Sequence, residues 1–415
     1  MNSSVTQEIV VVGIDWADQT HAFHLKSANL EQAGEFQQDA QAIEAQIERW
    51  RADHPQCQFL VTIETTKGPL ISALLKYDDI TIYPINPAAL AAYRKAFAHG
   101  GGKNDPGDAL LLCQYLEHYL EKLKPLRQNQ PLTRKLAAMA EDRRRLVDQR
   151  TAHCNELKAV LKSYFPEVLQ FGAAKIYADF IMAFLLKYPN LQAAKKAGPA
   201  RLRKLFYGIG SRAKAEARVQ TILNATALSD DETFNETCSM RAKALVSLIK
   251  VYTQQAREYD ARIAKDVRQH ADYSIFQSLP GASDLTHCRL IAAMGDDRAR
   301  YESAKSLQTA SGIAPLTTQS GKQRFVSSRW ACTKFLKQTF HEFAGLSIKQ
   351  SRWAAAYYQM LKDKGKTPQM AKRALAYKWQ RIIFRCWQDR VPYDEATYIE
   401  RLRKTNSPLY DLLQN

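Results

Sequence analysis

The sequence predicts an α/β domain at its N-terminal end, followed by regions that are entirely helical. Short β-rich runs alternate with segments of helical spacing over roughly the first 120 residues, which indicates a sheet with parallel crossovers. From about residue 130 to 270 the strand signal disappears. Apolar residues there recur three and four positions apart between Ala242 and Ile263, the spacing of a coiled coil. The expected fold class is α/β plus all-α: a mixed sheet with flanking helices, long coiled-coil helices, and a mainly helical C-terminal domain.

The elements of the first domain follow from local patterns. A polar turn separates the first two β-rich runs, which is the signal for a hairpin. The expected strands are 9–17, 21–27, 35–38, 59–65 and 80–85. The expected helices are 40–52, 69–76, 87–98 and 106–120.

Four parts are expected along the chain. Residues 1–125 form the α/β domain, and residues 126–272 form a coiled-coil region with an inserted basic helical hairpin. The coiled-coil spacing fits both a helix pair within one chain and a dimer seam. Residues 273–345 begin with a Leu-Pro-Gly turn, which resembles a helix-hairpin-helix whose backbone N–H groups bind phosphate, and contain the loop 312–321. Residues 346–415 form a basic helical tail.

The charge of the chain is distributed unevenly. The whole sequence has 59 basic and 42 acidic residues and a net charge of +17. Residues 1–125 carry a net −6, so the remainder carries +23, of which +13 falls within residues 321–390. A regional excess of this size favours a nucleic-acid partner, because cations neutralise phosphates. The alternative is a solvated basic surface with no specific partner.

Cysteine usage and hydropathy limit the cellular context. The seven cysteines are scattered singly without a C-x-x-C pair, which argues against a zinc site and a disulfide framework and fits a reducing cytoplasm. No apolar run approaches the roughly 20 residues that span a bilayer. The N-terminus lacks the basic region of a signal peptide. We therefore expect a cytoplasmic protein with no membrane partner.

Four carboxylates occur where an α/β sheet positions catalytic groups. Asp15 lies near the end of the first strand, Glu64 ends another strand, and Asp105 and Asp108 begin a helix. The i, i+3 spacing of the last two puts both on one helical face. Taken singly, each could be a turn former or a helix cap. Together they predict a site for Mg²⁺ or Mn²⁺, with two ions, because such cations prefer carboxylate oxygen ligands.

Basic residues gather around two further segments. Lys103 precedes Asp105 and is either a phosphate contact or a solvated loop lysine. The second set follows Gly321 and is interleaved with Phe325 and Trp330, a pattern typical of nucleic-acid-binding surfaces. Its cations are Lys322, Arg324, Arg329, Lys334 and Lys337. We expect the two aromatic residues to belong to the core rather than to stack on bases.

The order of these motifs resembles the DEDD transposases of bacterial insertion sequences, the family numbered one-ten, which includes the Piv-type DNA invertases. The N-terminal motifs are GID at Asp15, IET at Glu64, and K-x-D-x-x-D-A from Lys103. The C-terminal motifs are LPG and SGIAPLTTQSG, which resemble the family's C-terminal transposase domain. The resemblance covers roughly residues 9–345 and implies an RNase H-like, RuvC-like fold for the first domain.

The resemblance also implies a mechanism and a set of partners. The RuvC-like carboxylates would bind metal ions and the scissile phosphate. Ser320 would be a nucleophile that forms a 5′-phosphoserine link, with Ser327 and Ser328 as fallback candidates. Because no histidine lies near it in the loop, metal ions are its expected activator. The implied partners are the element-end and target DNA, a structured bridge RNA, and further copies of the chain in a dimer and a synaptic tetramer. The protein would be associated with the nucleoid during action.

Two other functions remain open at this point. In a metal-dependent hydrolytic nuclease or Holliday-junction resolvase, water attacks and Ser320 belongs to an ordinary Ser-Gly turn. In a nucleic-acid-binding protein with a decayed RNase H-like fold, no metal-dependent reaction occurs, although four retained carboxylates argue against decay.

Overall fold

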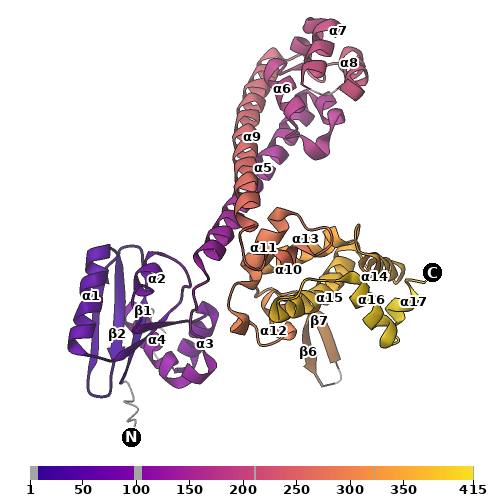
Figure 1. Cartoon of the computed structure of the whole chain (residues 1–415). Helices are drawn as coiled ribbons and strands as arrows, with labels where there is room; N and C mark the ends of the chain where they lie inside the picture. The colour runs from indigo at the N-terminus through magenta and orange to yellow at the C-terminus, as the bar shows by residue number, and fades with distance from the viewer. Residues whose placement is uncertain (1–7, 98–104, 210–211, 322, 415) are drawn as a thin grey trace. The chain divides into compact units, whose positions relative to one another are not determined.

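The computed structural model describes residues 8–97, 105–209, 212–321 and 323–414 (Figure 1). The chain forms two compact units, Met1–Gln128 and Asn129–Asn415. None of the helices in the described part of the chain is both long and apolar enough to cross a membrane.

The first unit is built on a five-stranded mixed sheet. Its strands are β1 (Ile9–Asp15), β2 (Thr20–Lys26), β3 (Glu31–Gln37), β4 (Gln58–Ile63) and β5 (Ile80–Pro84). They are arranged in the order β3-β2-β1-β4-β5. The first three strands form an antiparallel meander, whereas β4 pairs with β1 and β5 with β4 in parallel. This arrangement confirms the mixed sheet that the sequence predicts.

Helices cover both faces of this sheet. They are α1 (Ala40–Asp53), α2 (Pro69–Leu74), α3 (Pro87–Phe97), α4 (Asp105–Tyr119) and the 3₁₀ turn η1 (Leu120–Lys122). Alternate β1 residues, including Val12 and Ile14, join the cluster of buried side chains that also contains Trp50 of α1 and Leu70 of α2. Helix α4 packs on β1, β2 and β4, and α3 packs against α4.

A long antiparallel helix pair dominates the start of the second unit. Helices α5 (Pro131–Tyr164) and α9 (Glu232–Val267) lie side by side (Figure 1). Arg143 of α5 makes two hydrogen bonds to Asp260 of α9, at 2.8 and 3.1 Å. His153 stacks on Tyr252 with ring centroids 5.6 Å apart. The coiled-coil spacing therefore packs α9 against a helix of the same chain.

Short helices cap the far end of this pair. They are η2 (Pro166–Phe171), η3 (Ala173–Lys175), α6 (Asp179–Lys187), α7 (Leu191–Gly208), η4 (Arg212–Lys214) and α8 (Ala215–Asn224). Their aromatic core includes Phe184 and Phe206, which stack with centroids 5.6 Å apart. Helix α7 is kinked where Gly198 adopts φ +74° ahead of Pro199, because proline cannot continue the preceding helical hydrogen bonds.

The remaining helices surround a second large core. They are α10 (Tyr273–Gln277), α11 (Asp284–Met294), η5 (Arg298–Arg300), α12 (Ala304–Ala310), α13 (Lys334–Ser347), α14 (Arg352–Asp363), α15 (Pro368–Asp389), α16 (Glu395–Lys404) and α17 (Pro408–Asp411). Three fully buried tryptophans, Trp353, Trp379 and Trp387, belong to this core. Each indole N–H has an acceptor, including the Ser347 hydroxyl for Trp379.

A two-stranded hairpin interrupts the helices. Strands β6 (Leu316–Ser320) and β7 (Gln323–Ser327) pair in antiparallel and extend from the helical body (Figure 1). The sequence predicts a loop over 312–321, so this part of the prediction is wrong for 316–320. All five residues of β6 are exposed, so the segment has no apolar alternation by which a strand could be recognised.

Candidate functional site: a carboxylate edge and an exposed serine hairpin

Asp15 and Glu64 lie side by side at the carboxyl edge of the sheet. Asp15 is the last residue of β1, and Glu64 directly follows β4. These strands are parallel with Ile14 opposite Ile63, so the next residues, Asp15 and Glu64, occupy matching positions. Matching residues of adjacent parallel strands are on the same face of the sheet. Both residues are partly buried.

Helix α4 brings two further carboxylates to the same edge. A Cβ atom on Gly13 would lie 2.1 Å from the Ala109 carbonyl oxygen and 2.5 Å from the Cys113 nitrogen, so α4 contacts the β1 backbone directly. The Cys113 thiol approaches the Val11 carbonyl oxygen, at 3.8 Å. Since residue number rises along α4 as it falls along β1, the first turn of α4 lies toward the end of β1. That turn contains Asp105 and Asp108.

The two aspartates of α4 have different environments. Asp105 is exposed, whereas Asp108 is 5% exposed. Asp108 Oδ1 accepts a hydrogen bond from the Arg94 guanidinium at 2.5 Å. A buried carboxylate needs a partner of opposite charge, and Arg94 of α3 supplies it. Any cation that binds Asp108 therefore shares that carboxylate with Arg94.

His21 fixes the turn that follows Asp15. Its Nδ1 accepts the backbone N–H of Ala17 at 3.1 Å, so its Nε2 carries the proton and donates to Gln38 Oε1. Burial lowers the pKa of His21, and the hydrogen bond to Gln38 opposes that shift. A neutral imidazole therefore holds the chain where it leaves the carboxylate edge.

The chemistry of the four carboxylates suits a hard divalent cation. Carboxylate oxygens are the ligands that Mg²⁺ prefers, and the two strand residues and the first turn of α4 lie toward one edge of the sheet. Among the described residues, no three His, Cys, Asp or Glu side chains are grouped closely enough to hold a metal ion. Carboxylates repel one another without a cation between them, and Asp108 is turned to Arg94.

Ser320 occupies the tip of the hairpin in the second unit. It is the last residue of β6, is exposed, and pairs with Gln323 of β7. Gly321, at φ +57°, follows in the left-handed region that favours glycine. The Ser-Gly sequence thus has a structural role in the turn and also presents the serine hydroxyl to solvent.

Arg373 of α15 anchors the base of this hairpin. Its guanidinium donates to the carbonyl oxygens of Ile313, at 3.1 Å, and Gly312, at 3.3 Å. It also donates to the Ser328 hydroxyl at 2.5 Å. These acceptors precede β6 and follow β7, so one side chain ties both ends of the hairpin to the helical core. Arg373 therefore supports protein structure, although the sequence groups it with the basic tail.

The basic residues expected near the hairpin have different surroundings. Lys334, the first residue of α13, is exposed. Lys337 donates to the Arg329 carbonyl oxygen at 3.2 Å, and Arg329 is partly buried. Arg324 is on β7 opposite Gln319. Lys103 and Lys322 lie outside the described residues.

Phe325 and Trp330 do not belong to the core. Phe325 is 62% exposed and Trp330 is 91% exposed. The sequence-based expectation that both are core residues is therefore wrong. An aromatic side chain can alternate with cations either in a core or on a binding surface, and the sequence pattern alone does not distinguish the two.

The expected phosphate-binding turn at Gly281 is occupied by protein. The Gly281 N–H donates to Gln350 Oε1 at 2.9 Å. At φ +77°, a Cβ atom there would lie 2.6 Å from the Leu346 carbonyl oxygen. Gly281 thus allows the turn between α10 and α11 to pack on the end of α13, and its N–H is not available to a phosphate.

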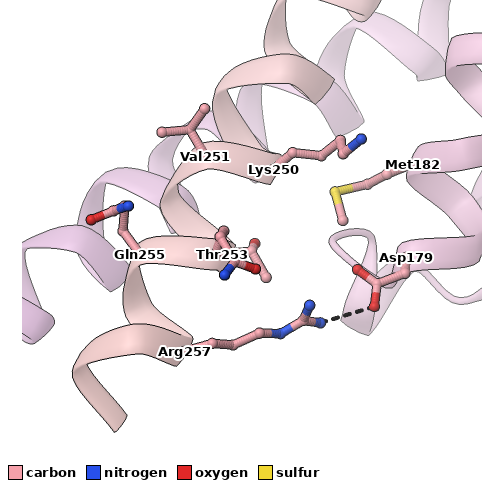
Figure 2. A pocket seen from close by; sticks show the side chains of 8 residues that line it. Asp179, Met182, Lys250, Val251, Thr253, Gln255 and Arg257 are labelled. Carbon is pink, nitrogen blue, oxygen red and sulfur yellow. Dashed lines mark hydrogen bonds and ion pairs between the residues drawn. The ribbon is translucent and has the colours of Figure 1, made fainter. Parts of the chain in front are cut away.

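A hollow between α6 and α9 contains none of the expected site residues. It has a volume of about 370 Å³, and its lining includes Met182, Lys250 and Thr253. An ion pair between Arg257 and Asp179, at 3.0 Å, closes one side (Figure 2). Because the charged side chains of this hollow are paired with each other or exposed to solvent, we assign it no part in the candidate site.

Sequence reasoning missed three residues that shape the candidate site. They are Gly13, Arg94 and Arg373. Each acts through a partner distant in sequence or on another element, so no local motif marks it. The sequence identifies Gly13 as part of the GID motif. Only the packing of α4 shows that this position must be glycine, because the α4 backbone approaches it closely.

Comparisons with known proteins show which families this chain resembles. A family model for DEDD transposases of the IS110 type matches residues 12–166, and a model described as transposase IS116/IS110/IS902 family matches residues 273–359. A Streptomyces coelicolor protein assigned as the transposase of the IS117 mini-circle is 26% identical over 399 residues, covering 93% of this chain and 95% of that protein. The 42 kDa protein of insertion element IS900 from Mycobacterium paratuberculosis is 24% identical over 311 residues, covering 72% and 74%.

Proposed function

We propose a mechanism from one premise: the chain belongs to the transposase family of the IS110, IS116 and IS902 insertion elements and is a DNA transposase. In this mechanism the protein cuts and rejoins DNA through a serine nucleophile that divalent metal ions assist. The observation that carries this proposal is the pair Asp15 and Glu64 at matching positions on one sheet edge, toward which the first turn of α4 is directed, on a chain that also presents an exposed serine. Family membership supports metal use in general terms.

The carboxylates act as metal ligands in this proposal. Asp15, Glu64, Asp105 and Asp108 hold the cations and, through them, the scissile phosphate. Two Mg²⁺ or Mn²⁺ ions held there would supply the positive charge that eases deprotonation of a hydroxyl and departure of an alkoxide. Arg94 holds the Asp108 carboxylate in position through their ion pair.

Ser320 acts as the nucleophile. Its Oγ forms a bond to phosphorus while the bond from phosphorus to the 3′ oxygen breaks, and the serine proton is transferred to that leaving oxygen. The product is a 5′-phosphoserine ester and a free 3′ hydroxyl. Attack of another 3′ hydroxyl on this ester reverses the exchange and rejoins DNA. Serine is a weak nucleophile that needs an activator, and this proposal assigns that role to the metal ions.

Binding of nucleic acid is assigned to the basic residues. In this proposal DNA or RNA phosphates are contacted by Lys322, Arg324, Arg329, Lys334 and Lys337, and also by Lys103, which precedes Asp105 in the sequence. Support comes from the net charge of +13 within residues 321–390. A structured guide RNA and a synaptic tetramer of two dimers complete the proposal, as the resemblance to bridge-RNA-guided recombinases implies.

The proposal is tested by trapping the covalent intermediate. The full chain is incubated with RNA transcribed from the flanks of its gene, labelled element-end DNA and Mg²⁺. We expect a protein–DNA adduct that survives denaturation and maps to the peptide containing Ser320. Ser320→Ala and Asp15→Asn should each reduce adduct formation by a factor on the order of 10³ or more, since each removes a group required for attack.

Ser327→Ala is the matched control, because Ser327 is an exposed serine of the same hairpin. It should leave the adduct unchanged. An adduct mapped to Ser327 would instead move the nucleophile along the hairpin. Cleaved DNA with free hydroxyl ends and no adduct would support the hydrolytic nuclease and leave Ser320 as a turn residue.

A further inference from the structure

We propose that Phe325 stacks on an unpaired base within two nucleotides of the phosphate that Ser320 attacks. This inference rests on the proposed function for the identity of that phosphate. It adds a substrate-positioning residue to the hairpin and requires the bound strand to be locally unpaired.

Strand register puts Phe325 and Ser320 on the same face of the hairpin. Ser320 pairs with Gln323 and Thr318 pairs with Phe325. Directly opposed residues of antiparallel strands share a face, and so do residues two apart on one strand. Phe325 is therefore two pairs further from the tip than Ser320, at the next position on the same face. Two residues along a strand span about 7 Å, which is about two nucleotide rises of 3.4 Å.

The hairpin presents this face to a partner rather than to its own core. All of β6 is exposed, and the Phe325 side chain is 62% exposed. A two-stranded hairpin has little stability by itself in water, and exposing a phenylalanine there gains nothing for folding. An aromatic ring on such an arm is best accounted for by a binding partner with apolar, flat surfaces.

Charge identifies this partner as nucleic acid. Residues 303–341 include six Lys or Arg residues and no Asp or Glu. A segment that is free of carboxylates and rich in cations favours a phosphate backbone, and a base provides the flat face for the ring. A base in a duplex is already stacked on both sides, so stacking on Phe325 requires a base that has left the helix.

The test combines a side-chain deletion with a base deletion. Binding of the full chain to element-end DNA is measured in a Ser320→Ala background, so that no reaction intervenes. Single abasic sites are introduced across the element end, one per probe. Phe325→Ala should weaken binding about 5- to 100-fold, the range for losing one stacked base. At one position, the abasic site should weaken binding by the parent and have almost no further effect on Phe325→Ala.

Val326→Ala is the matched control. Val326 is 63% exposed and is adjacent to Phe325 on β7, so it faces the opposite side of the hairpin. Its truncation should change binding less than twofold and should show no coupling to any abasic site, while Phe325→Trp should retain binding. Phe325→Ala binding as tightly as Val326→Ala, or losses that are equal at every abasic position, would overturn the proposal.

The result is separable from that of the proposed function. Coupling at a single base without a serine adduct would retain Phe325 as a stacking residue and reject Ser320 as the nucleophile. An adduct at Ser320 without coupling would retain the chemistry and reject the stacking. Coupling at a base more than two nucleotides from the mapped cut would overturn the stated proximity.

Discussion

Gly13 is the residue on which the carboxylate edge most directly depends. A Cβ at this position would lie 2.1 Å from the Ala109 carbonyl oxygen and 2.5 Å from the Cys113 nitrogen. Both are backbone atoms of α4, so no side-chain rotation relieves the clash. We expect Gly13→Ala to lower the free energy of unfolding by about 1–3 kcal/mol. It should also displace the first turn of α4 and reduce Mg²⁺-dependent cleavage more than stability alone explains. Urea unfolding and cleavage assays check both effects.

Gly208→Ala is the control for this substitution. No atom lies within 4 Å of a Cβ on Gly208, and its φ is not positive. Removing backbone freedom from the unfolded chain should therefore leave the protein unchanged or stabilise it by up to about 1 kcal/mol. Equal losses for the two variants would mean that close approach of α4 to β1 does not matter.

At the residue scale, the sequence is informative where a side chain lies at the end of a readable element. Asp15 and Glu64 follow runs of β-forming residues, and Asp105 and Asp108 begin an apolar helix, so their positions at the ends of these elements are predictable from α/β topology. Arg94 is not predictable in this way. Its role depends on the packing of α3 against α4, which no local pattern encodes.

At the element scale, the hairpin is the part that sequence periodicity misses. Buried strands such as β1 and β4 alternate or concentrate apolar residues, so their pattern is recognisable. Strand β6 has both faces exposed and contains Thr317, Thr318 and Gln319 in its centre. Its stability comes from β7 and from the anchor at its base, neither of which is visible in a single-strand window.

Arg373 should control the order of this hairpin. Arg373→Ala removes donors to Ile313, Gly312 and Ser328, and we expect a loss of about 1–3 kcal/mol because acceptors lose a charged partner. Hydrogen exchange of the β6 and β7 amides should accelerate much more than exchange in the α15 core. Yield of the serine adduct should fall with it, since the nucleophile is on the loosened arm.

Arg385→Ala is the corresponding control on the same helix. Arg385 is 69% exposed and forms an ion pair with Asp389 of the same helix at 3.5 Å. An exposed pair of this kind contributes between zero and about 1 kcal/mol. Exchange in the hairpin should therefore be unaffected. Equal acceleration by Arg385→Ala and Arg373→Ala would exclude a specific anchor.

At the scale of the whole molecule, charge is segregated between the two units. Residues 1–128 carry a net charge of −5 and the rest of the chain carries +22, which together give the total of +17. The acidic unit includes the carboxylates that suit a cation, and the basic unit includes the serine hairpin. The sequence predicts this division because net charge can be counted without knowing how the chain packs. Which side chains contact phosphate cannot be predicted in this way, because that depends on packing.

This segregation predicts a strong and unequal dependence of DNA binding on salt. The affinity of the full chain should fall linearly with the logarithm of salt concentration, with a slope set by the number of phosphates neutralised. Lys334→Gln removes an exposed cation of the basic unit and should reduce the slope by about 1. Lys76→Gln removes an exposed lysine of the acidic unit and should leave it unchanged. Fluorescence anisotropy on one non-specific duplex measures both slopes. If the two variants lowered the slope equally, binding would follow total charge, and the basic unit would have no special part in holding DNA.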